Sequence, residues 1–149
     1  MKGGGKLQKV SVRLPLEPQP KGRPRFRVAA GRVFTYTPKK TEQYENDVIR
    51  LYREMTGGYI FPKKTPLHVA LVFGMPIPKS TPKKQREQMI AGNIYETKRP
   101  DIDNLAKSVL DALNGIAYPD DSQITSLNLK KVYSEEPHIW VMIREEDTE

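Results

Sequence analysis

The 149-residue sequence contains no cysteine, so neither a disulfide nor a thiolate metal site can form within it. A divalent metal would have to be held by oxygen ligands or by one of the two histidines, His68 and His138. The sequence also lacks any apolar run approaching the roughly 18 residues of a membrane span. Residues 1–6 lack the apolar segment of a secretory signal. We therefore expect a cytoplasmic protein with no membrane partner.

Positive charge dominates the sequence, but its distribution is more informative than the net value of +7. Residues 1–100 carry 21 Lys and Arg against 7 Asp and Glu, whereas residues 101–149 carry 4 against 11. A basic part of this size suggests a polyanionic partner, of which nucleic acid is the commonest. A soluble basic protein with an acidic tail would show the same asymmetry, so charge alone leaves both interpretations open.

The hydrophobic pattern predicts one domain over residues 1–149, with flexible tails at 1–6 and about 145–149. Period-two alternation and short apolar runs predict strands at 7–16, 26–28, 33–36, 67–74, 124–133 and 139–143. Helical spacing predicts helices at 38–56, 82–91 and 102–114. We expect the strand at 67–74 to be central, because both its faces are apolar. The last two strands are expected to pair as an antiparallel hairpin. The fold class is α/β (α+β), a small mixed sheet flanked by helices.

A basic, proline-rich segment runs from Gln19 to Arg27. In an extended backbone alternate side chains share a side, so its cations would line one edge. These cations are Lys21, Arg23, Arg25 and Arg27. Such a ladder suits the phosphates of a nucleic acid. Charges and a proline on an edge strand also discourage aggregation, but four cations exceed what that role requires.

Acidic residues gather just before and just after the third predicted helix. The apolar stripe of this helix must face the core, which places Asp103 and Lys107 on its polar face, one turn apart. Asp101 can share their site only if it precedes the helix in an extended conformation. Pro100 favours such a break, because proline disfavours helical geometry in the residue before it. A second acidic pair, Asp120 and Asp121, follows the helix.

Helix-dipole and i, i+4 interactions, worth about 0.3–1 kcal/mol each or less, explain the acids at the helix start one by one. They do not explain the second pair. If Asp101, Asp103 and Asp121 converge, with Asp120 as a further candidate ligand, they need a cation, and oxygen ligands favour Mg²⁺ or Mn²⁺. Lys107 would then stabilise the charge of a phosphodiester transition state. A twelve-residue helix is about 18 Å long, so this convergence is a prediction that spacing alone does not supply.

Three segments together resemble the signature of the RusA family of Holliday junction resolvases. They are KRPDIDNLAK at 98–107, LDALNG at 110–115 and DDSQI at 120–124. The resemblance is sharpest over residues 98–124, and KGRPRF at 21–26 extends it weakly. It implies a small α/β homodimer that binds four-way DNA junctions by shape and makes paired, Mg²⁺-dependent nicks, with Mn²⁺ as a substitute.

By this likeness, Asp101, Asp103 and Asp121 match the catalytic and metal-binding carboxylates of the family. Lys107 matches its functional lysine, while Asp111 and Asp120 match acidic positions of less certain role. The expected DNA contacts come from Lys21, Arg23, Arg25, Arg27, Lys98 and Arg99. The leading hypothesis is therefore a structure-selective endodeoxyribonuclease of recombination and repair.

Two other functions fit parts of the sequence. A basic nucleic-acid-binding accessory protein would use its acids only as helix caps and turns, and would show salt-sensitive binding without cleavage. A metal-dependent phosphatase would hydrolyse small phosphoesters without preference for branched DNA. One common phosphatase pattern requires threonine or valine where Leu105 stands, so this hypothesis ranks last.

Overall fold

The computed structural model describes residues 8–22 and 25–147. In chain order, its elements are β1 (Lys9–Leu14), β2 (Arg25–Ala29), β3 (Arg32–Tyr36), α1 (Lys39–Thr56), β4 (Leu67–Pro76), α2 (Lys83–Ile90), α3 (Ile102–Leu113), η1 (Asp121–Gln123), β5 (Ile124–Ser134) and β6 (His138–Glu145). The η1 element is a single 3₁₀ turn. The tail expected at 1–6, residues 148 and 149, and Arg23 lie outside the described residues.

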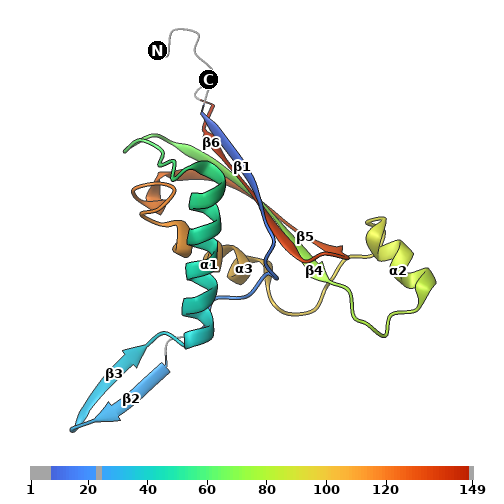
Figure 1. The fold of residues 1–149 in the computed structure, drawn as a ribbon, viewed down its shortest axis with the longest axis horizontal. Helices are drawn as coiled ribbons and strands as arrows, with labels where there is room; N and C mark the ends of the chain where they lie inside the picture. The colour runs from blue at the N-terminus through green and yellow to red at the C-terminus, as the bar shows by residue number, and fades with distance from the viewer. Residues whose placement is uncertain (1–7, 23–24, 148–149) are drawn as a thin grey trace.

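Four strands form one mixed sheet in the order β1-β6-β4-β5 (Figure 1). The β4–β5 pair is parallel, whereas β6 is antiparallel to both β1 and β4. The mixed sheet and its helices confirm the predicted fold class. The strand expected at 67–74 is also central, since β4 lies between β6 and β5.

The predicted hairpin between the last two strands is wrong. Leu71 of β4 stands between Leu129 of β5 and Val141 of β6, so β5 and β6 are not neighbours. A short link between two strands usually makes a hairpin. Here β4, whose faces are largely apolar, takes an interior position with a hydrogen-bonded strand on each edge. The link at 135–137 therefore carries the chain past the end of β4 instead of closing a hairpin.

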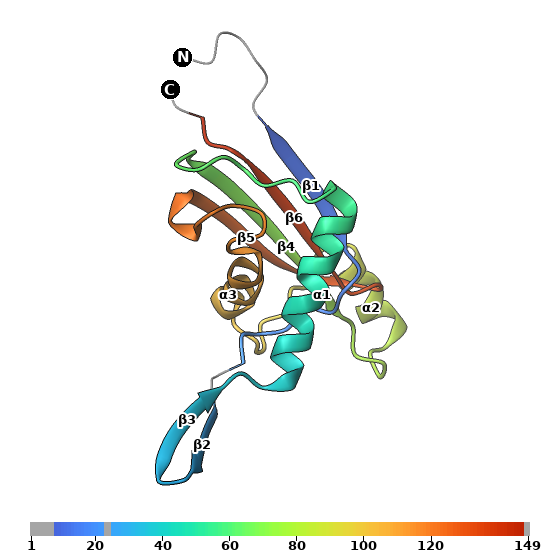
Figure 2. The ribbon, with the colours of Figure 1, turned by 60° about the vertical axis from the view of Figure 1, so that its left-hand side comes forward.

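Helices α1 and α3 lie side by side over one face of the sheet (Figure 2). Their apolar stripes supply fully buried side chains such as Val48, Tyr52 and Val109. These pack with Leu71 and Phe73 of β4 into a single core cluster. The core therefore fixes the orientation of α3 about its own axis, and with it the direction in which the polar side chains of α3 point.

Strands β2 and β3 form a separate two-stranded hairpin that projects from the body beyond the start of α1 (Figures 1 and 2). The strands predicted at 26–28 and 33–36 are confirmed. The two-residue turn of the hairpin places Ala30 and Gly31 at φ values of 50° and 74°, as a type I′ turn requires. All ten strand residues are exposed.

The C-terminal end of the described chain belongs to the sheet. Strand β6 runs through Glu145, and the Glu146 amide donates to the Pro66 carbonyl at 2.8 Å. Glu145, which was expected in the tail, is therefore the last residue of an interior strand, and Glu146 is hydrogen-bonded to the residue before β4. Over residues 8–22 and 25–147, no helix is long and apolar enough to cross a membrane.

Candidate functional site

Asp101 and Asp103 flank the first residue of α3. Asp101 has an extended backbone, with φ −69° and ψ 144°, and its carbonyl accepts the first helical hydrogen bond from the Leu105 amide at 3.1 Å. The prediction that Asp101 precedes the helix in an extended conformation is confirmed. Asp103 lies in the first turn, and both side chains are exposed. Neither forms an ion pair with any residue in the described part of the chain.

The buried face of α3 determines where its polar side chains point. Leu105, Val109 and Leu113 are fully buried against the core. Asp103 and Lys107 therefore occupy the exposed side, one turn apart. The predicted polar face is confirmed, and it leaves the Lys107 ammonium free to meet a substrate that approaches Asp103.

A lysine from the neighbouring strand holds the loop that carries Asp101. The Lys131 ammonium donates to the carbonyls of Lys98 and Pro100, both at 2.9 Å. Lys131 is not among the site residues predicted from the sequence. The pairing of β5 with β4 places it in register with fully buried Phe73, so it faces the helix-covered side of the sheet. A charged residue at such a position needs a polar partner.

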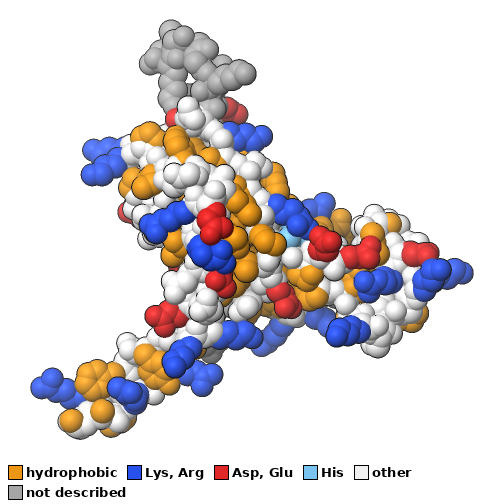
Figure 3. All heavy atoms as spheres, in the orientation of Figure 1, with side chains coloured by type: hydrophobic (Ala, Val, Ile, Leu, Met, Phe, Trp, Pro, Cys, Tyr) orange, Lys and Arg blue, Asp and Glu red, His pale blue; other side chains and the backbone are white. Residues whose placement is uncertain are grey.

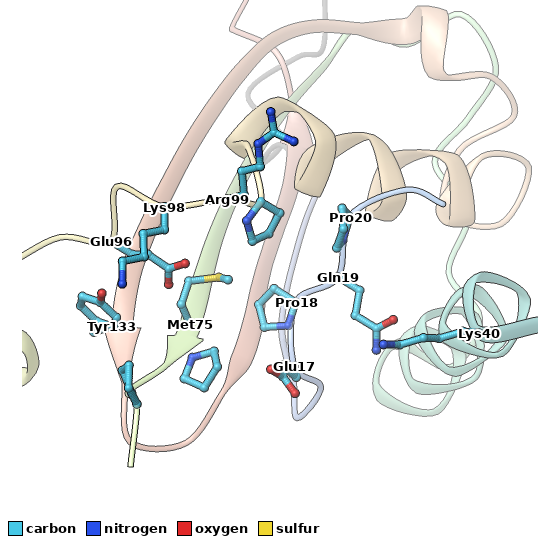
Figure 4. Close-up of a pocket in the computed structure, with 13 residues that line it drawn as sticks. Glu17, Pro18, Gln19, Pro20, Lys40, Met75, Glu96, Lys98, Arg99 and Tyr133 are labelled. Carbon is cyan, nitrogen blue, oxygen red and sulfur yellow. The ribbon is translucent and has the colours of Figure 1, made fainter. Parts of the chain in front are cut away.

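A pocket of about 380 Å³ lies beside this loop (Figure 4). It is lined by Glu17, Pro18, Gln19, Pro20, Lys40, Met75, Pro76, Pro78, Glu96, Lys98, Arg99, Pro100 and Tyr133. Burial raises the pKa of Glu96, an effect that Lys131 and Lys98 partly offset. Arg99 also lines a second hollow, which reaches Asp101 and Asn104. Two of the predicted DNA-binding cations therefore lie near Asp101: Lys98 and Arg99 both line the pocket, and Arg99 also lines the hollow that contains Asp101.

Asp120 and Asp121, the second acidic pair, have different environments. The Asp120 carboxylate accepts a hydrogen bond from the Ser122 amide at 3.3 Å, and the Gln123 side chain accepts one from the Asp120 amide at 3.3 Å. This reciprocal capping box begins η1. The hydrogen bonds from Ser122 lower the pKa of Asp120. Gln123 also donates to the Pro62 carbonyl at 2.9 Å, which fixes the turn against a neighbouring loop. The Asp121 side chain is exposed.

Asp121 lies at the far end of α3 from Asp101. Its amide donates to the Asn114 side-chain oxygen at 3.1 Å, directly after the last residue of the helix. Burial raises the pKa of Asp121, and the nearby Asp120 and Asp111 carboxylates raise it further. Within the described residues, no three His, Asp or Glu side chains lie close enough to hold a metal. The predicted convergence of the carboxylates is therefore not found in the single chain, because the Asn114 contact ties η1 to the opposite helix end.

Lys21 pairs with carboxylates of the protein itself, whereas the predicted phosphate ladder requires it to be free. Its ammonium lies 3.3 Å from Glu45 of α1 and 3.5 Å from Asp111 of α3, and its side chain is 25% exposed. The expected alignment of Lys21 with the arginines is wrong, since these two carboxylates draw it between the helices. Arg25 and Arg27 do share one face of β2, as predicted.

The family of the chain follows from its matches to known proteins. The family model "Endodeoxyribonuclease RusA" matches residues 15–144. The chain is 37% identical over 129 residues to the uncharacterized protein YqaN of Bacillus subtilis (strain 168), covering 87% of this chain and 91% of YqaN. It is 36% identical over 86 residues to the crossover junction endodeoxyribonuclease rusA of Lactococcus phage r1t, covering 57% and 59% of the two chains. The family match covers strands β4 and β5, helix α3 and the η1 turn, so the chain belongs to the RusA family of endodeoxyribonucleases.

Proposed function

We propose that the protein is a metal-dependent endonuclease that resolves four-way DNA junctions in recombination and repair by paired nicks. The observation that carries this proposal is the start of α3. There, Asp101 and Asp103 are exposed and have no ion-pair partner among the described residues, and Asp101 lines a hollow together with Arg99, in a chain of the RusA family. Two uncompensated carboxylates next to a cation suit a site that binds both a metal ion and a phosphate.

The residues at the start of α3 fit Mg²⁺, with Mn²⁺ as a substitute. Mg²⁺ is usually held by one or two carboxylates together with waters and substrate phosphates, rather than by a complete protein cage. Asp101 and Asp103 supply such a pair, and oxygen is the ligand type that both ions prefer. Bound there, the ion would polarise the phosphodiester and activate a water molecule. Lys107, one turn further on, would place its ammonium against the extra negative charge of the transition state.

A homodimer would complete the site and match the symmetry of the substrate. Asp121 lies at the other end of α3, so we assign it to the metal site of the partner subunit, where it would join Asp101 and Asp103. Two identical sites related by a twofold axis would then address two opposed strands of a junction. Asp120 acts as the cap of η1 in this arrangement and is not assigned as a ligand.

DNA would be held by the cations around the Asp101 depression and by those on the hairpin. Lys98 and Arg99 are exposed near Asp101, and Arg25 and Arg27 are exposed on the hairpin. Arg23 is proposed as a DNA contact from its sequence position alone. Lys21 is not proposed as a direct phosphate contact, because its ammonium already pairs with two carboxylates.

The test is cleavage of an end-labelled four-way junction in the presence of Mg²⁺ or Mn²⁺. The parent protein is expected to make paired nicks, and Asp101→Asn is expected to bind the junction without nicking it. Glu54→Gln, which removes an exposed charge from α1, serves as the matched control and should nick as the parent does. Nicking by Asp101→Asn at the parent rate would contradict the assignment. Salt-sensitive binding without cleavage would indicate an accessory protein, and turnover of small phosphoesters alone would indicate a phosphatase.

A further inference from the structure

The β2–β3 hairpin carries an apolar face that no described part of the molecule covers. Phe26, Val28 and Val33 are 72%, 71% and 65% exposed. They stand together, because Val28 pairs with Val33 and Phe26 follows on the same side of β2. Burying these side chains is favourable by roughly 25 cal/mol per Å² of apolar surface, so a ligand that covers this face would gain affinity from it.

The opposite face of the hairpin combines arginines with aromatic rings. Arg25 is directly opposite Tyr36, Arg27 is opposite Phe34, and Ala29 is opposite Arg32. Directly opposed residues of an antiparallel pair point to the same side. One face is therefore cationic and aromatic, while the other is apolar.

Charge identifies the kind of ligand. Residues 25–36 include three arginines and no Asp or Glu. Figure 3 shows the hairpin as blue and orange side chains without red ones. A nucleic acid offers phosphates to the arginines and flat, apolar base faces to the other side.

We propose that the β2–β3 hairpin is a branch-point contact, in which Phe26, Val28 and Val33 pack on unstacked bases while Arg25, Arg27 and Arg32 hold the adjacent phosphates. This inference rests on the proposed function and adds to it the part of the DNA that the hairpin contacts. In a continuous duplex the base faces are stacked on one another, so an apolar hairpin face finds them only where strands exchange. The hairpin would therefore contribute to the preference for branched over linear DNA.

The first experiment introduces a fluorescent reporter into the full-length protein. Phe26→Trp keeps an aromatic ring at the hairpin. It is made in an Asp101→Asn, Trp140→Phe background, which does not cut and has no other tryptophan. Its emission is expected to be quenched on addition of a four-way junction and to change little with a linear duplex of equal length. Ile60→Trp is the matched control, since Ile60 is 52% exposed beyond the other end of α1, and its emission should not respond to either DNA. Equal quenching by both DNAs at Phe26→Trp, or none, would overturn the inference.

A second variant tests the apolar contact itself. Phe26→Ser combined with Val28→Ser is expected to weaken junction binding about tenfold, because one lost stacking contact typically has this effect. Duplex binding and the melting temperature should stay unchanged, since both side chains lie outside the core. A change in the number of subunits by sedimentation would mean that the hairpin packs on a second copy, which would overturn the inference.

If the parent cuts junctions and the hairpin variants bind them normally, this inference fails alone. If the parent neither binds nor cuts them, the proposed function fails with it.

Discussion

The Lys131 ammonium lies 2.9 Å from the Pro100 carbonyl oxygen and 2.9 Å from that of Lys98. Strand β5 therefore holds the backbone that leads directly into Asp101. A charged donor shared by two carbonyls restrains this backbone more strongly than neutral hydrogen bonds would. Lys131 acts through Asp101 and not on the substrate, so it is a positioning residue.

Lys131→Met is expected to lower the rate of junction cleavage about tenfold and to raise the Mg²⁺ concentration needed for half-maximal rate. The physical reason is that Asp101 loses its fixed position, and small displacements of a reacting group are costly. Lys131→Arg retains two donors and should restore part of the rate. The matched control is Lys130→Met, which removes a charge from the opposite face of β5 and should leave the Mg²⁺ requirement unchanged. A lower melting temperature with an unchanged Mg²⁺ requirement would mean that Lys131 only stabilises the fold.

Lys107 is expected to act on the chemical step. Lys107→Met should reduce the single-turnover nicking rate about 10²-fold to 10³-fold, the usual effect of removing one donor that stabilises a transition state. Its binding to the junction, measured by gel shift, should change little, because one exposed cation among many contributes only part of the affinity. Lys9→Met, which removes an exposed cation from β1, is the control and should cleave normally. If Lys107→Met loses binding and cleavage equally, Lys107 is a DNA contact and not a catalytic residue.

Lys21 is expected to stabilise the fold more than it binds DNA. Lys21→Met would leave Glu45 and Asp111 close together without their shared cation, at side-chain exposures of 20% and 33%. The expected cost is about 1–2 kcal/mol, seen as a melting temperature about 2–8 °C lower. Arg25→Met provides the contrast, because it should weaken DNA binding and leave the melting temperature unchanged. The opposite result, a stable Lys21→Met with weak DNA binding, would support a phosphate ladder that includes Lys21.

The parts of the structure that the sequence predicted depend on local interactions. The apolar stripe of α3 predicted its buried face, and Pro100 predicted that Asp101 precedes the helix. Both predictions hold because the interactions behind them act within one helical turn. The positions of Lys21, Lys131 and Asp121 depend on contacts between distant segments, which periodicity does not contain. The same limit explains the mistaken β5–β6 hairpin, because the competing partner, β4, lies about 50 residues earlier in the sequence.

Asp120 is expected to behave as a helix cap. Asp120→Asn should keep both stability and cleavage, because asparagine caps a helix as well as aspartate does. Asp120→Ala removes the cap and should lower the melting temperature. The pKa of Asp120 is lowered in the folded state, so its charged form stabilises the protein above the unfolded pKa. This stabilisation is lost as the pH falls through the folded pKa. The difference between the parent and Asp120→Ala should therefore become smaller in acid. A cleavage defect in Asp120→Asn would instead support a metal-ligand role.

The separation of Asp121 from Asp101 along α3 predicts complementation between subunits. If each site takes Asp101 and Asp103 from one subunit and Asp121 from its partner, a heterodimer of Asp101→Asn with Asp121→Asn has one site with every native carboxylate. Two differently tagged chains, co-expressed and purified in tandem, isolate this heterodimer. It should nick one strand of the junction, at about half the parent rate per dimer, while both mutant homodimers stay inactive.

The control heterodimer pairs Asp101→Asn with Asp103→Asn. Both changes affect the same half of a shared site, so neither site in this heterodimer is complete and no nicking is expected. An inactive Asp101→Asn/Asp121→Asn heterodimer would mean that Asp121 serves the site of its own chain, which requires η1 to leave Asn114 when DNA binds. A protein that sediments as a monomer while cutting junctions would also contradict the shared site. Single-strand nicking by the first heterodimer alone therefore distinguishes a site built by two subunits from one assembled within a single chain.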